Sequence, residues 1–361
     1  MTRLLVVDDS ALMRRLLTDI FGSETDFHVE AARDGNEAIA KLHTYKPDVI
    51  TLDVHMPGMD GIACLDRIMV ERPTPVVMIS ALTEEGAEET LEALSLGAVD
   101  FAPKPAGALS LEIEKIADEI VAKVRQASKV QLSKASRLSE RLQLRTHQRP
   151  SRQPKNVVTR PLKSLSQLTG QGLVLVGTST GGPPALDKLL VPLPKNFAWP
   201  ILIAQHMPST FTGPLAQRLD RICELHVQEV TKSQRLEPGC AYVGRGDADL
   251  IVTRRPAGLF AMAVPVDTEL RWHPSVDRLV SSALDHELAQ QIVGVLMTGM
   301  GTDGADTMTR LHALGGLTIA EDEASAVVWG MPGALVQSGG ASLVVPTSEI
   351  AGHLLHLVGT R

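Results

Sequence analysis

The sequence predicts an α/β protein of two domains, each built around a parallel β-sheet. Three observations carry this prediction. Apolar runs of strand length alternate with longer segments of helical periodicity, first over residues 1–124 and again from about residue 173 onward. A segment poor in apolar residues separates the two series. At 361 residues the chain is also long enough for two domains of ordinary size.

The first series contains five strand–helix units, which is typical of a doubly wound parallel sheet. Its strands are expected at residues 4–7, 28–32, 49–52, 76–79 and 99–102. Its helices are expected at residues 12–21, 37–43, 61–70, 85–96 and 109–124, and the last of these closes the domain.

Residues 122–163 form a basic segment with twelve Lys or Arg residues and a single acid, Glu140. Ser, Gln and Pro are frequent and apolar residues are few, which is typical of a solvated linker. A docking arm for an acidic surface or for the first domain is the alternative. A continuation of the preceding helix to about residue 144 also stays open. We expect domains at residues 1–124 and 169–361, joined by a linker at 125–168.

The second series begins with apolar runs at residues 173–176, 200–204 and 292–297, each of the length of a buried strand. Residues 241–264 differ, because glycine-containing turns at 244–247 and 256–258 interrupt their short apolar runs. We expect irregular or antiparallel structure there. The remainder predicts a second, Rossmann-like α/β domain.

Bulk properties exclude several classes of protein. The net charge of −7 argues against general nucleic-acid binding, which favours basic domains. No apolar stretch approaches the roughly 18 residues of a membrane span, and the first residues lack the pattern of a signal peptide, so we expect a cytoplasmic protein without direct membrane insertion. The three cysteines are widely separated, which indicates reduced thiols.

Polar residues follow the strands of the first domain at one edge of its sheet. Asp8 and Asp9 come directly after the first strand, and Asp53 ends the third. Ser80 ends the fourth strand and Lys104 follows the fifth. Three crowded carboxylates repel each other unless a cation joins them, and Mg²⁺ prefers such oxygen ligands. The alternative is that these acids only cap helices and loops while Lys104 is a surface charge.

Three segments of the second domain supply the residue types of a hydrolase site. Ser179 lies in Gly-Thr-Ser-Thr-Gly at 177–181, which has the G-x-S-x-G spelling of a nucleophile elbow. His206 and Asp303 each follow another predicted strand. Because carboxyl ends of parallel strands converge in one crevice, these side chains could serve as nucleophile, general base and orienting acid.

Other interpretations of the same segments stay open. Glycine-rich turns between a strand and a helix also bind dinucleotide phosphates, although Ser179 here occupies the second glycine position of G-x-G-x-x-G. A plain structural turn is a further alternative for the elbow, and a satisfied core or turn histidine is the alternative for His206. Asp303 could cap the helix expected at 305–314.

The segment at residues 52–61, Leu-Asp-Val-His-Met-Pro-Gly-Met-Asp-Gly, closely resembles the acceptor segment of response-regulator receiver domains. The resemblance implies a flavodoxin-like fold and phosphorylation of Asp53 by a histidine kinase. It also implies that Ser80 is the switch hydroxyl and Lys104 the phosphate-binding lysine. The implied Mg²⁺ ligands are Asp8, Asp9, Asp53 and the backbone carbonyl of His55.

Across both domains the chain resembles the chemotaxis-type protein-glutamate methylesterases, the CheB family. The segments that carry this resemblance are residues 177–182, 205–208, 211–212, 271–277, 296–304 and 330–332. It implies Ser179, His206 and Asp303 as catalytic residues. Thr180 and the backbone amide of Met300 would lie at the oxyanion pocket, with residues 273–275 and 329–332 at its rim.

The resemblance implies removal of methyl esters from glutamates on the cytoplasmic helices of chemoreceptors, with release of methanol and glutamine deamidation as a second activity. No cofactor is expected for the hydrolysis. One departure is His55, which stands where related methylesterases often carry an acid and bears on the lifetime of the phosphorylated state. A non-enzymatic adaptor with a receiver is the alternative function. A transcription factor is disfavoured, since the acidic second half offers no basic recognition helix.

Overall fold

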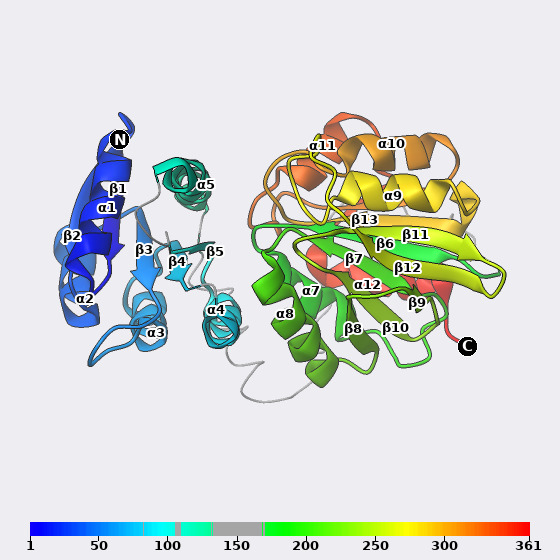
Figure 1. Cartoon of the computed structure of the whole chain (residues 1–361), viewed down its shortest axis with the longest axis horizontal. Helices are drawn as coiled ribbons and strands as arrows, with labels where there is room; N and C mark the ends of the chain where they lie inside the picture. Colours follow the sequence, from blue (N-terminus) through cyan, green and yellow to red (C-terminus); the bar gives the residue numbers. More distant parts are fainter. Residues whose placement is uncertain (82, 105–109, 131, 133–167, 169) are drawn as a thin grey trace. The chain divides into compact units, whose positions relative to one another are not determined.

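The computed structural model describes residues 1–81, 83–104, 110–130, 132, 168 and 170–361. The chain forms two compact units, each with its own parallel sheet (Figure 1). Most of the expected linker at 125–168 lies outside the described residues, as does most of the helical continuation toward residue 144. The last helix of the first unit ends at Ala127.

The first unit has five parallel strands in the order β2-β1-β3-β4-β5. This is the flavodoxin-like order, and the doubly wound fold is confirmed. The strands are β1 (Thr2–Val7), β2 (Phe27–Ala32), β3 (Val49–Asp53), β4 (Val76–Ser80) and β5 (Asp100–Pro103). Along this part of the chain the helices are α1 (Ala11–Gly22), α2 (Gly35–Thr44), α3 (Gly61–Glu71), α4 (Glu84–Leu96), which links β4 to β5, and α5 (Ser110–Ala127).

The sheet of the first unit is covered on both faces. Strands β3, β4 and β5 are buried along their whole length, which explains their nearly continuous apolar runs. The helices begin soon after the strands because short polar side chains cap them. Ser10, Asp34 and Asp60 accept hydrogen bonds from the third backbone amide beyond them. Polar groups are thereby concentrated at the carboxyl edge of the sheet.

The second unit has a seven-stranded parallel sheet in the order β15-β14-β13-β6-β7-β10-β8. Strand order reverses between β6 and β13, and ligand sites of open α/β sheets lie at such a switch point. The strands are β6 (Leu173–Thr178), β7 (Ile201–Gln205), β8 (His226–Val230), β10 (Cys240–Gly244), β13 (Ile292–Leu296), β14 (Leu317–Glu321) and β15 (Leu343–Val345).

Helices cover both faces of this second sheet (Figure 1). One face carries α9 (Val276–Leu284), α10 (Ala305–Ala313) and α11 (Met331–Gln337). The other carries α7 (Gly182–Leu190), α8 (Ser209–Ile222) and α12 (Thr347–Val358). A 3₁₀ turn, η2 (Ala289–Gln291), precedes β13. Within the described ranges, no helix combines the length and apolar character needed to cross a bilayer.

The expectation for residues 241–264 was wrong in its first part. Strand β10 is a buried parallel strand between β7 and β8, not an irregular or antiparallel piece. It is short and ends at a glycine, a pattern that sequence alone does not assign to a central strand. The remainder is antiparallel as expected, because β11 (Asp249–Arg255) and β12 (Gly258–Val264) form a hairpin that pairs with β9 (Gln234–Arg235).

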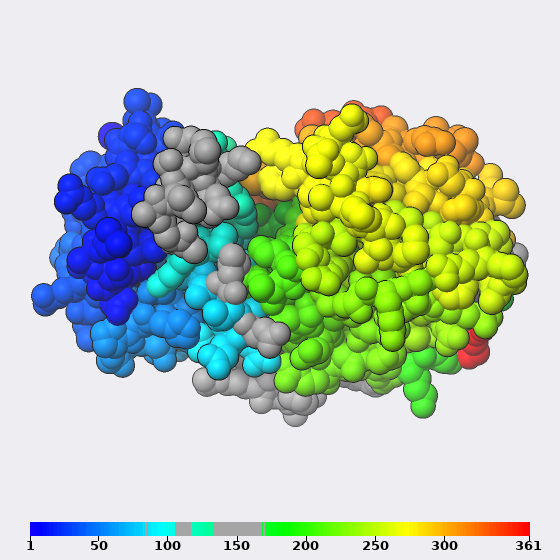
Figure 2. Space-filling view, in the orientation of Figure 1, coloured from blue at the N-terminus to red at the C-terminus, as the bar shows by residue number. Residues whose placement is uncertain are grey.

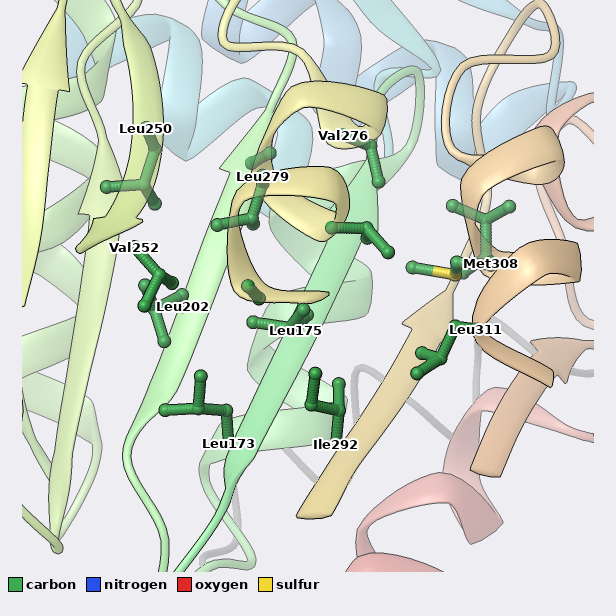
Figure 3. Close-up of a cluster of buried hydrophobic side chains, with 14 of the residues drawn as sticks. Leu173, Leu175, Leu202, Leu250, Val252, Val276, Leu279, Ile292, Met308 and Leu311 are labelled. Atoms are coloured by element: carbon green, nitrogen blue, oxygen red, sulfur yellow. The ribbon is translucent and has the colours of Figure 1, made fainter. Parts of the chain in front are cut away.

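A hydrophobic cluster packs the hairpin, α9 and α10 onto one face of the main sheet (Figure 3). Its strand residues include Leu173, Leu175, Leu202 and Ile292, and its outer residues include Leu250, Val252, Val276, Leu279, Met308 and Leu311. Burial of each such side chain stabilises the fold by about 1.5–3 kcal/mol. The cluster fixes the first turns of α9 and α10. In the space-filling view, the hairpin and the segment after it, in yellow-green and yellow, form part of the visible face of this unit (Figure 2).

Candidate active site

The structure brings the three predicted hydrolase residues to the carboxyl edge of the second sheet. Ser179 follows β6, His206 follows β7, and Asp303 lies between β13 and α10. Nε2 of His206 is 2.7 Å from Oδ2 of Asp303, and each side chain is only 6% exposed. The backbone amide of His206 donates to the carbonyl of Thr178, so the histidine is tied to the strand end that carries Ser179.

The turn that carries Ser179 is tight because glycines surround it. Gly181 has a φ of +76°, a conformation that favours glycine. A Cβ at Gly182 would collide with Oε1 of Gln205, whose Nε2 donates to the carbonyls of Ser179 and His206. Gln205 therefore links the nucleophile candidate to the base candidate. Sequence reasoning assigned it no role, although it directly precedes His206.

Substitution of Gly182 by Ala is expected to displace Gln205, because the new methyl group has no room. Such overpacking costs about 1–3 kcal/mol, and we expect at least a tenfold loss of ester hydrolysis. Thermal unfolding and initial rates measure the two effects. Gly352→Ala is the control, since a Cβ there meets nothing within 4 Å in the middle of α12. That variant should keep its rate and gain about 0.5–1 kcal/mol. Equal rates in both variants would contradict the assigned role of Gln205.

The carboxylate of Asp303 is held by the first turn of α9. Oδ2 accepts from the backbone amide of Val276 at 2.7 Å, in addition to His206. Oδ1 accepts from the hydroxyl of Ser275 at 3.0 Å and the amide of Asp277 at 3.1 Å. Burial by itself raises the pKa of Asp303, but the hydrogen bond and charge of His206 and these amides outweigh it and lower the pKa. Asp303 is therefore held as an anion beside the imidazole.

Asp277 performs the reciprocal task for α10. Its Oδ1 accepts from the hydroxyl of Thr307 at 2.7 Å and from the amide of the same residue at 3.3 Å. Burial raises the pKa of Asp277; hydrogen bonds from Thr307 oppose that rise, and the nearby charge of Asp303 adds to it. The first turn of α9 thus binds Asp303, which precedes α10, and the first turn of α10 binds Asp277, which lies at the start of α9. The position of Asp303 therefore depends on both helices.

The imidazole of His206 has one ring nitrogen engaged and one available. Nδ1 is buried, and no hydrogen-bond partner for it exists among the described residues. It is therefore the nitrogen left to receive a proton, whereas chymotrypsin-like triads use Nε2 for that purpose. The ring of Trp272 stacks on His206 with centroids 5.5 Å apart and planes 9° apart. From the sequence, Trp272 stood out only as part of the segment at residues 271–277 and had no assigned role. Its aromatic ring next to the predicted rim residues was the one feature that could have pointed to it.

A second buried carboxylate, Asp249 of β11, fixes the predicted rim at residues 273–275. It accepts from Nδ1 of His273 and the amide of Ser275, both at 2.9 Å, and from Nη1 of Arg278 at 2.8 Å. Burial raises the pKa of Asp249, but the bonds from His273, the backbone amides and Arg278 together lower it. The hairpin thereby holds Ser275 within hydrogen-bond distance of Asp303, a contribution that was not predicted from the sequence.

Thr180 and Met300 lie in the two loops that meet at Ser179. Thr180 is 5% exposed, and its carbonyl accepts from the hydroxyl of Thr298 at 2.8 Å. Met300 follows Gly299, where a Cβ would lie 2.8 Å from Cβ of Ser179. The carbonyl of Gly299 accepts from the amides of residues 330 and 331, so the predicted rim at 329–332 packs on the same loop. The oxyanion role of Thr180 and Met300 stays a prediction.

The polar residues of the first unit also meet at one sheet edge. The carboxylates of Asp8, Asp9 and Asp53 offer oxygens that lie within 4.8 Å of one another. Nζ of Lys104 is 2.7 Å from Oδ2 of Asp53 and 3.6 Å from Oδ2 of Asp8. Burial, and then the charge of Asp53, raise the pKa of Asp8. Oδ2 of Asp8 is buried and has no hydrogen-bond partner within the described residues, which fits a site for a hard divalent cation.

Ser80 and His55 flank this acidic site. Ser80 is buried at the end of β4, and its carbonyl accepts from the amide of Lys104 at 2.8 Å. The amide of His55 donates to Oδ1 of Asp53 at 3.2 Å, while its side chain is exposed. The predicted convergence of these residues at one edge is thus present.

The fold and the two sites define a class: a receiver-type unit with an acidic edge, joined to an α/β unit that brings Ser179, His206 and Asp303 to one sheet edge. Comparisons with known proteins agree. Residues 4–114 match the response regulator receiver domain, and residues 174–354 match the CheB methylesterase family.

Full-length relatives give the same assignment. The chain is 53% identical to protein-glutamate methylesterase/protein-glutamine glutaminase 2 of Rhodopseudomonas palustris, over 97% of this chain and 96% of the relative. It is 49% identical to protein-glutamate methylesterase/protein-glutamine glutaminase 3 of Rhodospirillum rubrum, over 98% and 95%. The crystal structure of the Thermotoga maritima CheB methylesterase catalytic domain matches with a TM-score of 0.50 and 36% identity, over 52% of this chain and 98% of that one. The chain belongs to the CheB methylesterase family.

Proposed function

We propose that the chain is a phosphorylation-regulated protein-glutamate methylesterase that also deamidates glutamine. The observation that carries the proposal is the buried pair of His206 and Asp303, 2.7 Å apart, beside the glycine-bounded turn of Ser179. Family membership supports the same activity. The adaptor alternative is not favoured, because an adaptor has no need of a nucleophile, base and acid at one sheet edge.

The proposed reaction begins with attack of Oγ of Ser179 on the ester carbonyl, while Nδ1 of His206 takes the hydroxyl proton. Asp303 stabilises the imidazolium that forms. Collapse of the tetrahedral intermediate breaks the ester C–O bond, and the imidazolium gives its proton to the departing methoxide oxygen, which leaves as methanol. Water, activated by His206, then hydrolyses the acyl-serine to glutamate and free Ser179.

Charge on the carbonyl oxygen needs donors during both steps. We assign these to Thr180 and the backbone amide of Met300, since both loops meet at Ser179. Each such donor contributes roughly 3–4 kcal/mol to lowering the barrier. The same groups serve for a glutamine carboxamide, with ammonia as the leaving group. The proposed hydrolysis draws on protein groups alone.

The proposed regulation works through Asp53 as phosphoryl acceptor, with a histidine kinase as donor. Asp8, Asp9, Asp53 and the backbone carbonyl of His55 would hold Mg²⁺. When bound, this ion screens the negative charges of carboxylates and phosphoryl oxygens. Lys104 already contacts Asp53 and is suited to bind a phosphoryl oxygen, with the hydroxyl of Ser80 as a further partner. Phosphorylation then changes activity only if the phosphoryl group on Asp53 interacts more favourably with one conformational state of the chain than with another.

The proposed substrate is the methylated cytoplasmic domain of a chemoreceptor, and the proposed location is the cytoplasm. Nucleic acid is not a proposed partner. The direct test is methanol release from a methylated receptor fragment, measured with and without a small phosphodonor and Mg²⁺. Absence of release from the wild type under both conditions would sink the proposed activity.

Replacement of Asp53 by Asn should remove the response to the phosphodonor. The wild type is expected to change its rate of methanol release when acetyl phosphate and Mg²⁺ are added, whereas Asp53→Asn should give one rate under both conditions, because its amide accepts no phosphoryl group. Asp66→Asn, at an exposed position of α3, is the matched control and should respond like the wild type. A response that persists in Asp53→Asn would move the acceptor elsewhere.

A further inference from the structure

Glu321 is a buried acid that the proposed reaction does not use. It is the last residue of β14, beside β13, and only 1% of it is exposed. Burial raises the pKa of its carboxyl group, and hydrogen bonds from Thr347, Thr298 and Ser325 oppose that rise. Burial of a carboxylate lowers the stability of the fold unless hydrogen-bond donors surround it, so the presence of Glu321 here calls for a physical reason.

Donors converge on both oxygens of this carboxylate. Oε2 accepts from the backbone amide of Thr298 at 2.7 Å. Oε1 accepts from the hydroxyl of Ser325 at 3.0 Å and from the hydroxyl of Thr347. The backbone carbonyl of Glu321 accepts from Nε1 of Trp329 at 2.8 Å. Glu321 therefore joins the end of β13 to the start of α12 and to the predicted rim.

Thr298 in turn holds the nucleophile turn at three consecutive residues. Its carbonyl accepts from the hydroxyl of Thr178 and from the amide of Ser179, both at 3.0 Å. Its hydroxyl donates to the carbonyl of Thr180 at 2.8 Å and accepts from the amide of Val328 at 3.0 Å. A single residue thus contacts the turn before, at and after Ser179. Met300 lies two residues after Thr298. Movement of Thr298 therefore displaces both the hydroxyl of Ser179 and the backbone amide of Met300, which are the proposed nucleophile and oxyanion donor.

We propose that Glu321 is a positioning residue of the esterase reaction, which acts through Thr298 to set Ser179 against the loop of Met300. The essential contact is the acceptor oxygen that reaches the amide of Thr298. This inference rests on the proposed function for its kinetic test. It requires reach and an acceptor at that amide, and it does not require negative charge.

The chain offers substitutions that separate reach from charge. Glu321→Gln keeps the length: its Oε1 can accept from Thr298, while its amide donates to a hydroxyl of Ser325 or Thr347. Glu321→Asp keeps the charge but is one methylene too short to reach Thr298. Glu321→Leu removes the acceptor altogether. Thr318→Val is the matched control, because this buried hydroxyl of the same strand bonds the carbonyl of Gly340 and takes no part in the Thr298 network.

The expected order of kcat with a methylated receptor fragment is wild type and Glu321→Gln together, then Glu321→Asp and Glu321→Leu. A misplacement of about 1 Å at Ser179 predicts a loss of up to roughly 100-fold in kcat for the last two, with KM within about twofold. Thr318→Val should lower the unfolding temperature and leave kcat unchanged. If Glu321→Leu does not fold, the comparison of Asp with Gln decides. Equal kcat for those two variants, or a loss shared by Thr318→Val, would overturn the inference.

A second readout keeps the inference separate from the proposed function. A fluorophosphonate probe forms an Oγ–P bond with an activated serine as fluoride leaves, and intact mass reports the rate. Labelling of Ser179 should follow the same order as kcat across the variants. A wild type that is labelled but releases no methanol would sink the proposed function and leave this inference to the labelling rates. Equal labelling of wild type, Glu321→Asp and Glu321→Leu would sink the inference instead.

Discussion

Ser179→Ala is expected to abolish methanol release from a methylated receptor fragment, with a loss of roughly 10⁵- to 10⁶-fold in kcat. The reason is that Ser179 is proposed to supply the attacking oxygen, on the turn directly after the end of β6 to which the backbone amide of His206 is hydrogen-bonded. The loss concerns the chemical step, so affinity for the receptor fragment should be retained. Steady-state methanol assays and a binding titration measure the two quantities.

Ser348→Ala is the matched control, since this serine is exposed on α12 of the same unit. It should release methanol at the wild-type rate. The phosphodonor should change the wild-type rate and leave the Ser179 variant inactive. Methanol release at similar rates from wild type and Ser179→Ala would remove Ser179 from the mechanism, whatever the fold suggests.

Asp303→Asn is expected to lower kcat by roughly 10⁴-fold, because the amide no longer holds and stabilises the imidazolium as the carboxylate does. It should also lower the free energy of unfolding by about 1–3 kcal/mol, since an amide nitrogen would face donors that a carboxylate oxygen accepts. Neither orientation of the Asn side chain avoids this clash of donors, because Oδ1 and Oδ2 of Asp303 each accept from a backbone N–H group. Kinetics and urea unfolding at neutral pH measure the two losses.

The stability loss should itself depend on pH. The pKa of Asp303 is lowered by folding, so its contribution is fully present above the unfolded value of about 3.9 and is lost as pH falls through the folded value. The difference in unfolding free energy between wild type and Asp303→Asn should therefore shrink on acidification below about pH 4. Asp306→Asn, exposed in the first turn of α10, should show little difference at either pH. A gap that is constant with pH would show that Asp303 is not held as an anion.

Much of the fold followed from the sequence because parallel strands buried on both faces leave a strong signal. Most of the predicted functional side chains stand at or just after the end of such a strand, as Asp53 and Ser179 do, and strand ends of one sheet share an edge. The position of these residues at strand ends in the sequence was therefore enough to predict that their side chains lie close together. The prediction was wrong for β10, because this strand is short and ends at a glycine, a residue that is also common in turns.

Residues that support the site from the side were not predictable in the same way. Glu321 and Thr298 meet because β13 and β14 are neighbours, and the order of strands is not written in their separate patterns. Asp249 lies on a hairpin outside the main sheet, and its bond to the amide of Ser275 depends on how that hairpin packs. Trp272 lay within a recognised segment, but its stacking on His206 is a tertiary contact.

The donors around Asp303 bear on how the site tolerates change over evolutionary time. Two of them are backbone amides in the first turn of α9, and no side-chain replacement other than proline deletes a backbone amide. The environment of the acid is therefore insulated from most mutations in that turn, which remains free to vary its outward side chains. Drift in this part of the enzyme would act mainly through the hydroxyl of Ser275, the one adjustable donor beside His206. The backbone of α9 therefore sets the position of Asp303, and side-chain substitution in that turn changes its hydrogen bonding mainly at Oγ of Ser275.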